Sequence, residues 1–291
     1  MSIKSIIVLG AFVLTTIHPV WAQGAPENIT DPKSIFEKGY IQVTGLSEAG
    51  QTQVKALRVA QLVAQRALLE TLQGLQLQGQ TTVKKGMLAS DEIRTTVEGY
   101  LKGAIKCGEL FHADKGYAEV CMRVPLRGQG GIYELFMPLI QNNSLWAEQP
   151  VQARFTTKSM TEIQPNVPFT PAPCPSTNMV YDGLIIDVRN FGFKPALANR
   201  VLNAKNELVF GPARIAGNVL VERGCGGFTT DLNKAKAMLA QWGSTCPLVL
   251  TPTGIDQDTD VRLSEDDAAA LLAHDQQSAL LAQAKVVYLL K

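Results

Sequence analysis

The sequence predicts an α+β protein in which an N-terminal long helix packs on a small antiparallel sheet, followed by a proline-rich linker and a second domain of mixed α/β structure. Three observations lead to this prediction. Small and apolar residues recur at three- and four-residue steps over residues 53–73, which is typical of an amphipathic helix. Apolar and polar residues alternate over residues 117–126, which is typical of a half-buried strand. Six prolines lie between residues 149 and 178, where neither a helix nor a sheet ladder is expected.

The first 22 residues have the form of a secretory signal peptide. Lys4 precedes an apolar run at 6–13, and small residues stand where signal peptidase needs them, so we expect cleavage after Ala22. An uncleaved N-terminal anchor is the alternative. There is no cysteine near the expected cleavage site to which a lipid could be attached. Any contact with a membrane is therefore expected to be made by the protein surface. Cleavage removes one of the 27 basic residues, so the mature chain has 26 basic and 26 acidic residues and no formal net charge. A neutral chain argues against nucleic acid or anionic lipid as the main partner.

The first half of the chain is expected to form a small sheet with its covering helix. The small residues Ala56, Ala60 and Ala64 would let the helix axis come close to the sheet. A turn at 113–116 is expected to close a hairpin that turns Glu119 and Arg123 away from the apolar face. The expected elements, in order, are a strand at 39–44, a helix at 53–73, a strand at 75–83, a helix at 90–100 capped by Ser90, and hairpin strands at 104–111 and 117–126.

The second half alternates helices and strands, which predicts a mixed α/β domain. Its first strand is apolar except for two aspartates, and its last helix has an acidic start that follows a capping Ser264. The expected elements are a strand at 180–188, a hairpin of 198–202 with 208–211, helices near 217–222 and 230–242, strands at 247–251 and 261–263, a helix from 264, and a final strand at 285–290.

Five cysteines remain after signal cleavage, which in an oxidising compartment allows two disulfides and one free thiol. Cys107 and Cys121 flank the expected hairpin turn almost symmetrically, so we expect them to pair across it. Cys225 with Cys246 is the second expected pair, which leaves Cys174 free. None of the spacings is a CxxC, so zinc or iron–sulfur ligation fits poorly.

No motif in the sequence predicts catalysis, a cofactor or a metal. His112 and His274 fall in different halves and are expected to be solvated surface histidines rather than general bases. The glycine run at 224–227 lacks the spacing of a phosphate loop and is expected to connect two helices flexibly. The acidic residues at 256–260 lack the glycine and glutamate of a calcium loop, which favours a surface turn.

Asp187 and Arg189 form the one candidate polar site. They are two residues apart in the first strand of the second half and so project to the same face. A structural ion pair is the favoured interpretation, because a charge in an apolar strand is usually kept by a partner. The alternative is half of a small polar binding site.

A pattern of alanine, leucine and valine over residues 37–126 resembles a known family. The residues that carry it are Ala56-Leu57-Arg58, Ala67-Leu68-Leu69-Glu70, Leu75-Gln76-Leu77, Thr81-Thr82-Val83, Gly103-Ala104 and the stretch 120–126. This segment resembles the twenty-kilodalton LPP lipoprotein family and also the N-terminal domain of the flagellar protein FlgT. The resemblance implies a non-catalytic periplasmic protein associated with the outer membrane, in the flagellar case one that helps to assemble a ring around the motor. Residues 181–189 and 194–197 resemble a domain that accompanies such modules in envelope proteins.

We therefore expect a non-catalytic periplasmic or outer-membrane-associated envelope protein, a structural or assembly factor that binds envelope or flagellar-base proteins and not nucleic acid. A periplasmic protein that binds a small ligand near Asp187 and Arg189 is the alternative. The expected divisions are a signal peptide at 1–22, a lipoprotein-like domain at 37–140, the linker at 149–178 and a C-terminal domain at 179–291.

Overall fold

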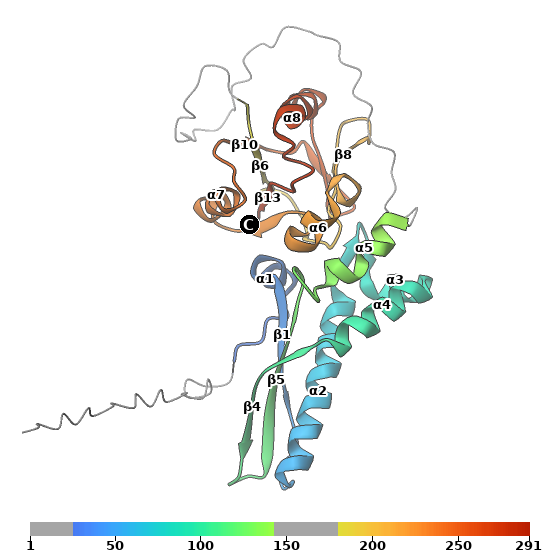
Figure 1. Ribbon diagram of the computed structural model, residues 1–291, viewed down its shortest axis with the longest axis vertical. Coiled ribbons are helices and arrows are strands. Elements are labelled where there is room, and N and C mark those ends of the chain that lie inside the picture. Colours follow the sequence, from blue (N-terminus) through green and yellow to red (C-terminus); the bar gives the residue numbers. More distant parts are fainter. Residues whose placement is uncertain (1–25, 143–179) are drawn as a thin grey trace, which may run out of the picture.

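The computed structural model describes residues 26–142 and 180–291 (Figure 1). The expected signal peptide at 1–22 and linker at 149–178 lie outside the described residues. The described residues fold into eight α-helices and four sheets, two of them with four strands. No helix among them has both the length and the apolar character needed to cross a membrane.

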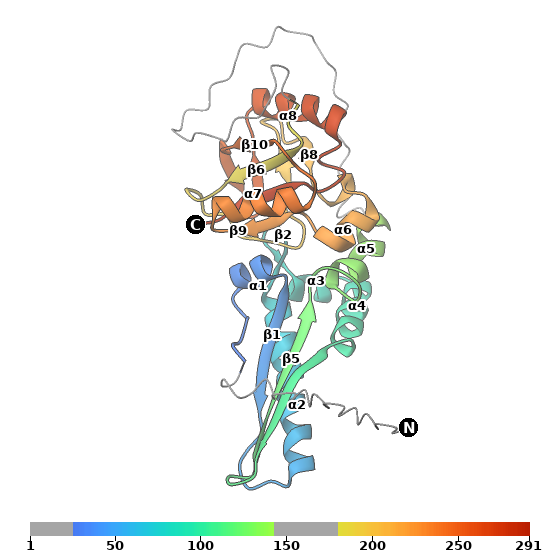
Figure 2. The ribbon, with the colours of Figure 1, turned by 60° about the vertical axis from the view of Figure 1, so that its left-hand side comes forward.

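The lower part of the molecule is an arm made of one long helix and a three-stranded antiparallel sheet (Figures 1 and 2). The strands have the order β1-β5-β4, and α2 (Gln53–Gly74) covers one face of them. The helix buries an i, i+4 stripe of small residues and leucines against β1 and β5. The strands are β1 (Tyr40–Leu46), β4 (Ile105–His112) and β5 (Tyr117–Pro125).

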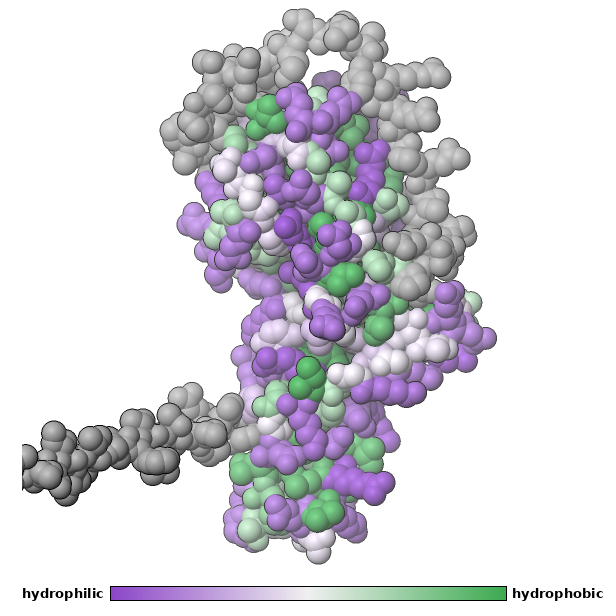
Figure 3. All heavy atoms as spheres, in the orientation of Figure 1, coloured by the Kyte–Doolittle hydropathy of each residue, from purple (hydrophilic) through white to green (hydrophobic). Residues whose placement is uncertain are grey.

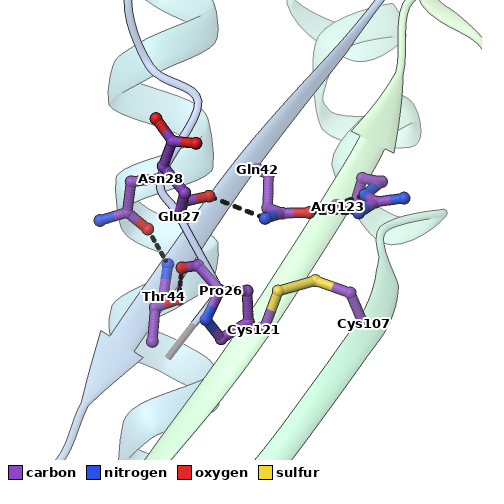
Figure 4. Close-up of a disulfide and its surroundings, with 8 residues drawn as sticks. All are labelled: Pro26, Glu27, Asn28, Gln42, Thr44, Cys107, Cys121 and Arg123. Carbon is purple, nitrogen blue, oxygen red and sulfur yellow. Dashed lines mark hydrogen bonds between the residues drawn. A yellow bond between two sulfur atoms is a disulfide. The ribbon is translucent and has the colours of Figure 1, made fainter. Parts of the chain in front are cut away.

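A disulfide joins Cys107 and Cys121 across the β4–β5 hairpin, which confirms the expected pair. Their Cα atoms are 5.1 Å apart. Gly108 lies opposite Cys121 and Lys106 opposite Met122, so Cys107 is the extra residue of a β-bulge. Figure 4 shows the disulfide on the sheet face opposite α2, beside Pro26.

The top of the arm carries short elements that meet the second half of the chain. The expected single strand at 75–83 is instead a short hairpin, because the chain reverses at Gly79 with a φ of +54°. Ser90 caps the following helix as expected, by accepting a hydrogen bond from the backbone N–H of Ile93 at 3.3 Å. The elements here are α1 (Pro32–Lys38), β2 (Gln76–Gln78), β3 (Thr81–Thr82), α3 (Val83–Ala89), α4 (Asp91–Lys102) and α5 (Ile132–Asn142).

The centre of the second half is an all-parallel sheet of order β10-β6-β13-β9. One face of it packs on α7, with Ile185 and Val287 against Leu239. The other face, with Leu184, belongs to the main core, which also contains Leu271 of α8. The elements are β6 (Gly183–Asp187), β9 (Gly227–Thr229), β10 (Pro247–Leu250), β13 (Val286–Leu289), α7 (Leu232–Gln241) and α8 (Glu265–Ser278).

A second sheet of order β11-β12-β7-β8 stands beside the parallel one. Its strands are β7 (Val201–Leu202), β8 (Leu208–Phe210), β11 (Gly254–Asp256) and β12 (Asp260–Arg262). A 3-10 turn (Pro212–Arg214) and α6 (Gly217–Arg223) lead from it back to β9.

The predicted fold class is wrong and is corrected to a mixed α/β fold with several sheets. The first helix of the described residues is the seven-residue α1, so no long helix stands at their N-terminal end. The β2–β3 hairpin also joins the second half through backbone hydrogen bonds: the N–H groups of Leu197 and Ala198 donate to the carbonyls of Gln76 and Leu77, both at 3.0 Å. Sequence periodicity cannot show such pairing, because the partners are more than a hundred residues apart.

Candidate functional site

A cavity of about 430 Å³ that is largely open to solvent lies at the carboxyl end of β9, between α1 and α7. In parallel sheets, ligand sites lie at this end of the strands, and ligand pockets measure roughly 300–1,000 Å³. Two of the lining residues are hydrogen-bonded to each other, because the Thr229 hydroxyl donates to Glu37 Oε1 at 3.3 Å. The lining residues are Glu37, Lys38, Phe228, Thr229, Lys234, Ala237, Met238 and Gln241.

The cavity combines charges of both signs with an apolar wall. Lys38 and Lys234 are exposed and Glu37 is half-buried, while Phe228 is buried beneath them. Such a lining fits a small molecule that has a charged group and an apolar part. Sequence reasoning missed this site because α1 and α7 are nearly two hundred residues apart and carry no motif.

The predicted polar site, Asp187 with Arg189, lies outside this cavity at the end of β6. The Arg189 guanidinium donates from Nη2 to Asp187 Oδ2 at 2.6 Å and from Nε to Oδ1 at 2.9 Å. The Arg189 backbone N–H also donates to Oδ1, at 3.2 Å. The two charges satisfy each other, so the arrangement has the geometry of the structural ion pair favoured from the sequence.

This pair predicts a specific acid sensitivity. Hydrogen bonds from the Arg189 side chain hold the pKa of the Asp187 carboxyl below its usual value of 3.8. The unfolded chain therefore binds this proton more readily, so the stability from Asp187 is present above about pH 4 and is lost as pH falls through the lowered pKa. Asp187→Asn should reduce the loss of stability between pH 5 and pH 3 in urea titrations followed by circular dichroism. An unchanged pH slope would contradict this assignment.

The two histidines contact neighbouring side chains and backbone in separate parts of the structure. His112 Nε2 lies 3.1 Å from Glu119 Oε1, and its ring stacks on Tyr117. His274 Nδ1 accepts a hydrogen bond from the Tyr181 backbone N–H at 3.4 Å, and burial lowers the pKa of His274. Within residues 26–142 and 180–291, neither imidazole is hydrogen-bonded to a hydroxyl or thiol side chain. Both rings are partly buried, so neither is the fully solvated histidine that we expected.

The expected disulfide between Cys225 and Cys246 does not form. Cys225 is a free, buried thiol, and Cys246 is disulfide-bonded. Cys174, which was expected to be free, lies outside the described residues. Burial raises the pKa of the Cys225 thiol, so it stays protonated and unreactive. The positions of two cysteines in the sequence do not show whether their side chains face each other in the fold. The predicted Cys225–Cys246 pair was wrong for that reason.

The glycine run at 224–227 is a buried joint between α6 and β9, not a flexible connection between helices. A Cβ on Gly224 would meet the Tyr133 ring at 2.5 Å, and one on Gly226 would meet the Val286 carbonyl oxygen at 2.5 Å. Arg127 Nη2 donates to the Gly226 carbonyl at 3.2 Å. Gly224 therefore leaves room for the Tyr133 ring of the first half, and Gly226 allows close approach to the backbone of β13 within the second half.

Each acidic residue of 256–260 has its own cationic partner. Lys194 Nζ donates to Asp258 at 2.9 Å, and Asp260 is paired with Arg200. Asp256 is paired with Arg262. These residues form the turn and the ends of the β11–β12 hairpin. Among the described residues, no group of three or more histidine, cysteine or acidic side chains is placed to hold a metal ion.

The comparison with known families concerns the second half of the chain. Residues 183–291 match the family model described as Treponema pallidum Tp0624, second domain. The match begins at β6 and includes both four-stranded sheets. No curated protein matches the chain. Over this segment, and not over the arm, the chain is similar to that Treponema pallidum domain.

Proposed function

We propose that the protein is a non-catalytic structural or assembly factor of the cell envelope, periplasmic or associated with the outer membrane, that binds another envelope protein. The Cys107–Cys121 disulfide supports an oxidising compartment. The signal-like N-terminus and the resemblance of residues 37–126 to LPP lipoproteins and to FlgT support the envelope, and the latter makes a flagellar-base protein one candidate partner.

The open edge strand β4 is the observation that carries this proposal. Among the described residues, β4 pairs only with β5, whereas the outer edge of β1 is covered by residue Ile29, which exchanges backbone hydrogen bonds with Gln42. Ile105, at the start of β4, is 65% exposed. An open edge presents unpaired backbone groups to which a partner strand can add.

The sheet face around Glu119 and Arg123, which we expected to turn away from the apolar face, is engaged within the chain. Glu119 contacts His112, and the Arg123 guanidinium lies 4.3 Å over the Tyr40 ring. Figure 4 shows Arg123 pointing toward Gln42, which also donates to the Glu27 carbonyl. This leaves the β4 edge, rather than that face, for a partner.

Site-specific photo-crosslinking in cells tests the proposal. A photoreactive amino acid at Glu109, on the exposed side of β4, should give one discrete adduct with a second envelope protein. The same amino acid at Asp266, exposed at the start of α8, is the control and should give none. Ile105→Lys should reduce the adduct at least several-fold, because an edge lysine opposes strand addition.

The non-catalytic part of the proposal has its own control. His112→Gln with His274→Gln should give the same adduct and should complement a deletion strain as well as the natural chain does. A correctly folded double variant that fails to complement would show that the histidines carry chemistry. Equal adducts from Glu109 and Asp266 would show that the edge is not the binding surface.

Small-ligand binding is a second candidate function, and the cavity between α1 and α7 is the observation that favours it. Native mass spectrometry of protein purified from cells tests it directly. A bound molecule should be lost in Met238→Trp, which fills the cavity. Protein that carries no added mass, with or without that substitution, would rule this function out.

A further inference from the structure

The side of α2 that points away from the sheet carries apolar and basic side chains together. Val54, Leu62 and Val63 are 81%, 57% and 43% exposed, and they account for three of the seven large apolar side chains that the described residues leave exposed. Steps of three and four residues place them beside three basic residues. This α2 outer face consists of Val54, Lys55, Arg58, Leu62, Val63 and Arg66.

The three cations of the α2 outer face lack ion-pair partners. No carboxylate lies within ion-pair distance of Lys55, Arg58 or Arg66 in the part of the chain that the structure describes. The first acidic residue along the helix is Glu70, past the end of this face. The α2 outer face is therefore locally positive, although the basic and acidic residues of the whole chain nearly balance.

The shape of this face favours a flat partner. It is the outward side of one long helix at the side of the arm (Figure 1), where exposed apolar side chains lie among exposed basic ones. Figure 3 shows the same mixture of apolar and hydrophilic residues over the visible surface of the arm. Lysine and arginine stems lie along apolar surface while their charges reach outward. An exposed helix face that mixes basic and apolar side chains is typical of helices that lie in a membrane interface, where anionic headgroups attract the charges.

We propose that the α2 outer face binds the surface of an anionic phospholipid bilayer, with the helix parallel to the membrane plane. Val54 and Leu62 would enter the headgroup boundary while Lys55, Arg58 and Arg66 meet the lipid phosphates. The expectation from net charge alone, that anionic lipid is not a main partner, overlooks this grouping. This inference goes beyond the proposed function, because it concerns a different surface from the β4 edge. The experiment on one surface can contradict its proposal without affecting the other proposal.

Vesicle co-sedimentation of the full chain without its first 22 residues tests the inference. We expect binding to vesicles of 30% phosphatidylglycerol in phosphatidylcholine at low salt, and much weaker binding to pure phosphatidylcholine or at high salt. Each basic residue near an anionic surface contributes on the order of five-fold in affinity. Lys55→Gln, Arg58→Gln and Arg66→Gln together should therefore weaken binding about 100-fold. Leu62→Gln with Val54→Gln should weaken it about ten-fold.

The matched control changes three exposed lysines elsewhere on the same half of the chain. Lys84→Gln, Lys85→Gln and Lys102→Gln remove the same charge from α3 and α4 and should change binding less than two-fold. Circular dichroism checks that every variant is folded. Equal binding to both kinds of vesicle, or an equal loss in the control, overturns the proposal. A dimer seen by light scattering that the α2 substitutions dissolve would assign the face to a second copy of the chain instead.

Discussion

Gly45→Ala is expected to destabilise the protein by about 3 kcal/mol, a large effect for one added methyl group. Gly45 lies on β1 directly against the backbone of α2. A Cβ there would stand 2.2 Å from the Ala60 carbonyl oxygen and 2.4 Å from the Ala64 backbone nitrogen. Both atoms belong to the middle of a 22-residue helix, so relief requires the whole helix to move off the sheet. Urea denaturation followed by circular dichroism measures the change.

Gly99→Ala is the matched control for this substitution. Gly99 lies inside α4 and has open space where a Cβ would be. Alanine is favoured over glycine in a helix, so this variant should gain roughly 0.5–1 kcal/mol. If Gly45→Ala is as stable as the natural chain, α2 does not lie this close to β1.

The sequence predicted the parts of the arm whose signals are local. The helix expected at 53–73 is α2 (Gln53–Gly74), because its periodicity extends over six turns. The hairpin register is right to one residue, and the difference is the bulge at Cys107. A bulge adds a residue without changing the composition, so alternation alone could not place it.

The parts that the sequence could not predict depend on contacts between distant segments. Residues 75–83 predict one strand, and the turn at Gly79 that divides them is held by a distant segment, because the Gly79 backbone N–H donates to the Thr259 hydroxyl at 2.8 Å. The Asp187–Arg189 ion pair could be predicted because its two residues are only two positions apart in the sequence. The cavity was missed because Glu37 and Lys234 belong to helices that are nearly two hundred residues apart in the sequence, and neither helix carries a binding motif.

A line of aromatic rings joins the two halves of the chain. The Phe36 ring of α1 makes an edge-to-face contact with the Phe228 ring, with ring centroids 5.2 Å apart, and Phe228 stacks on Tyr288 at 5.1 Å. Phe193 also stacks on Tyr288, with ring centroids 5.2 Å apart. Figure 2 shows α1 directly beneath β9, the strand that carries Phe228. Phe228 thus packs against side chains from both sides of the expected linker.

Phe228→Ala is expected to lower the free energy of unfolding by about 3–5 kcal/mol, because it removes a fully buried ring that contacts both Phe36 and Tyr288. Since Phe36 also loses its aromatic contact, the loss of stability should extend to the arm as well as to the parallel sheet. Hydrogen exchange read by mass spectrometry should therefore show β1 and β6 losing protection together.

Phe193→Ala is the control for this substitution, because Phe193 is partly exposed at the outer end of the line and does not stack on Phe36. It should cost about 1–2 kcal/mol, and its loss of protection should stay within the second half of the chain. If Phe228→Ala instead exposes the parallel sheet while β1 and α2 keep full protection, the two halves unfold independently. In that case the division at 149–178 is a true domain boundary, and the contacts across it are too weak to couple the arm to the second half.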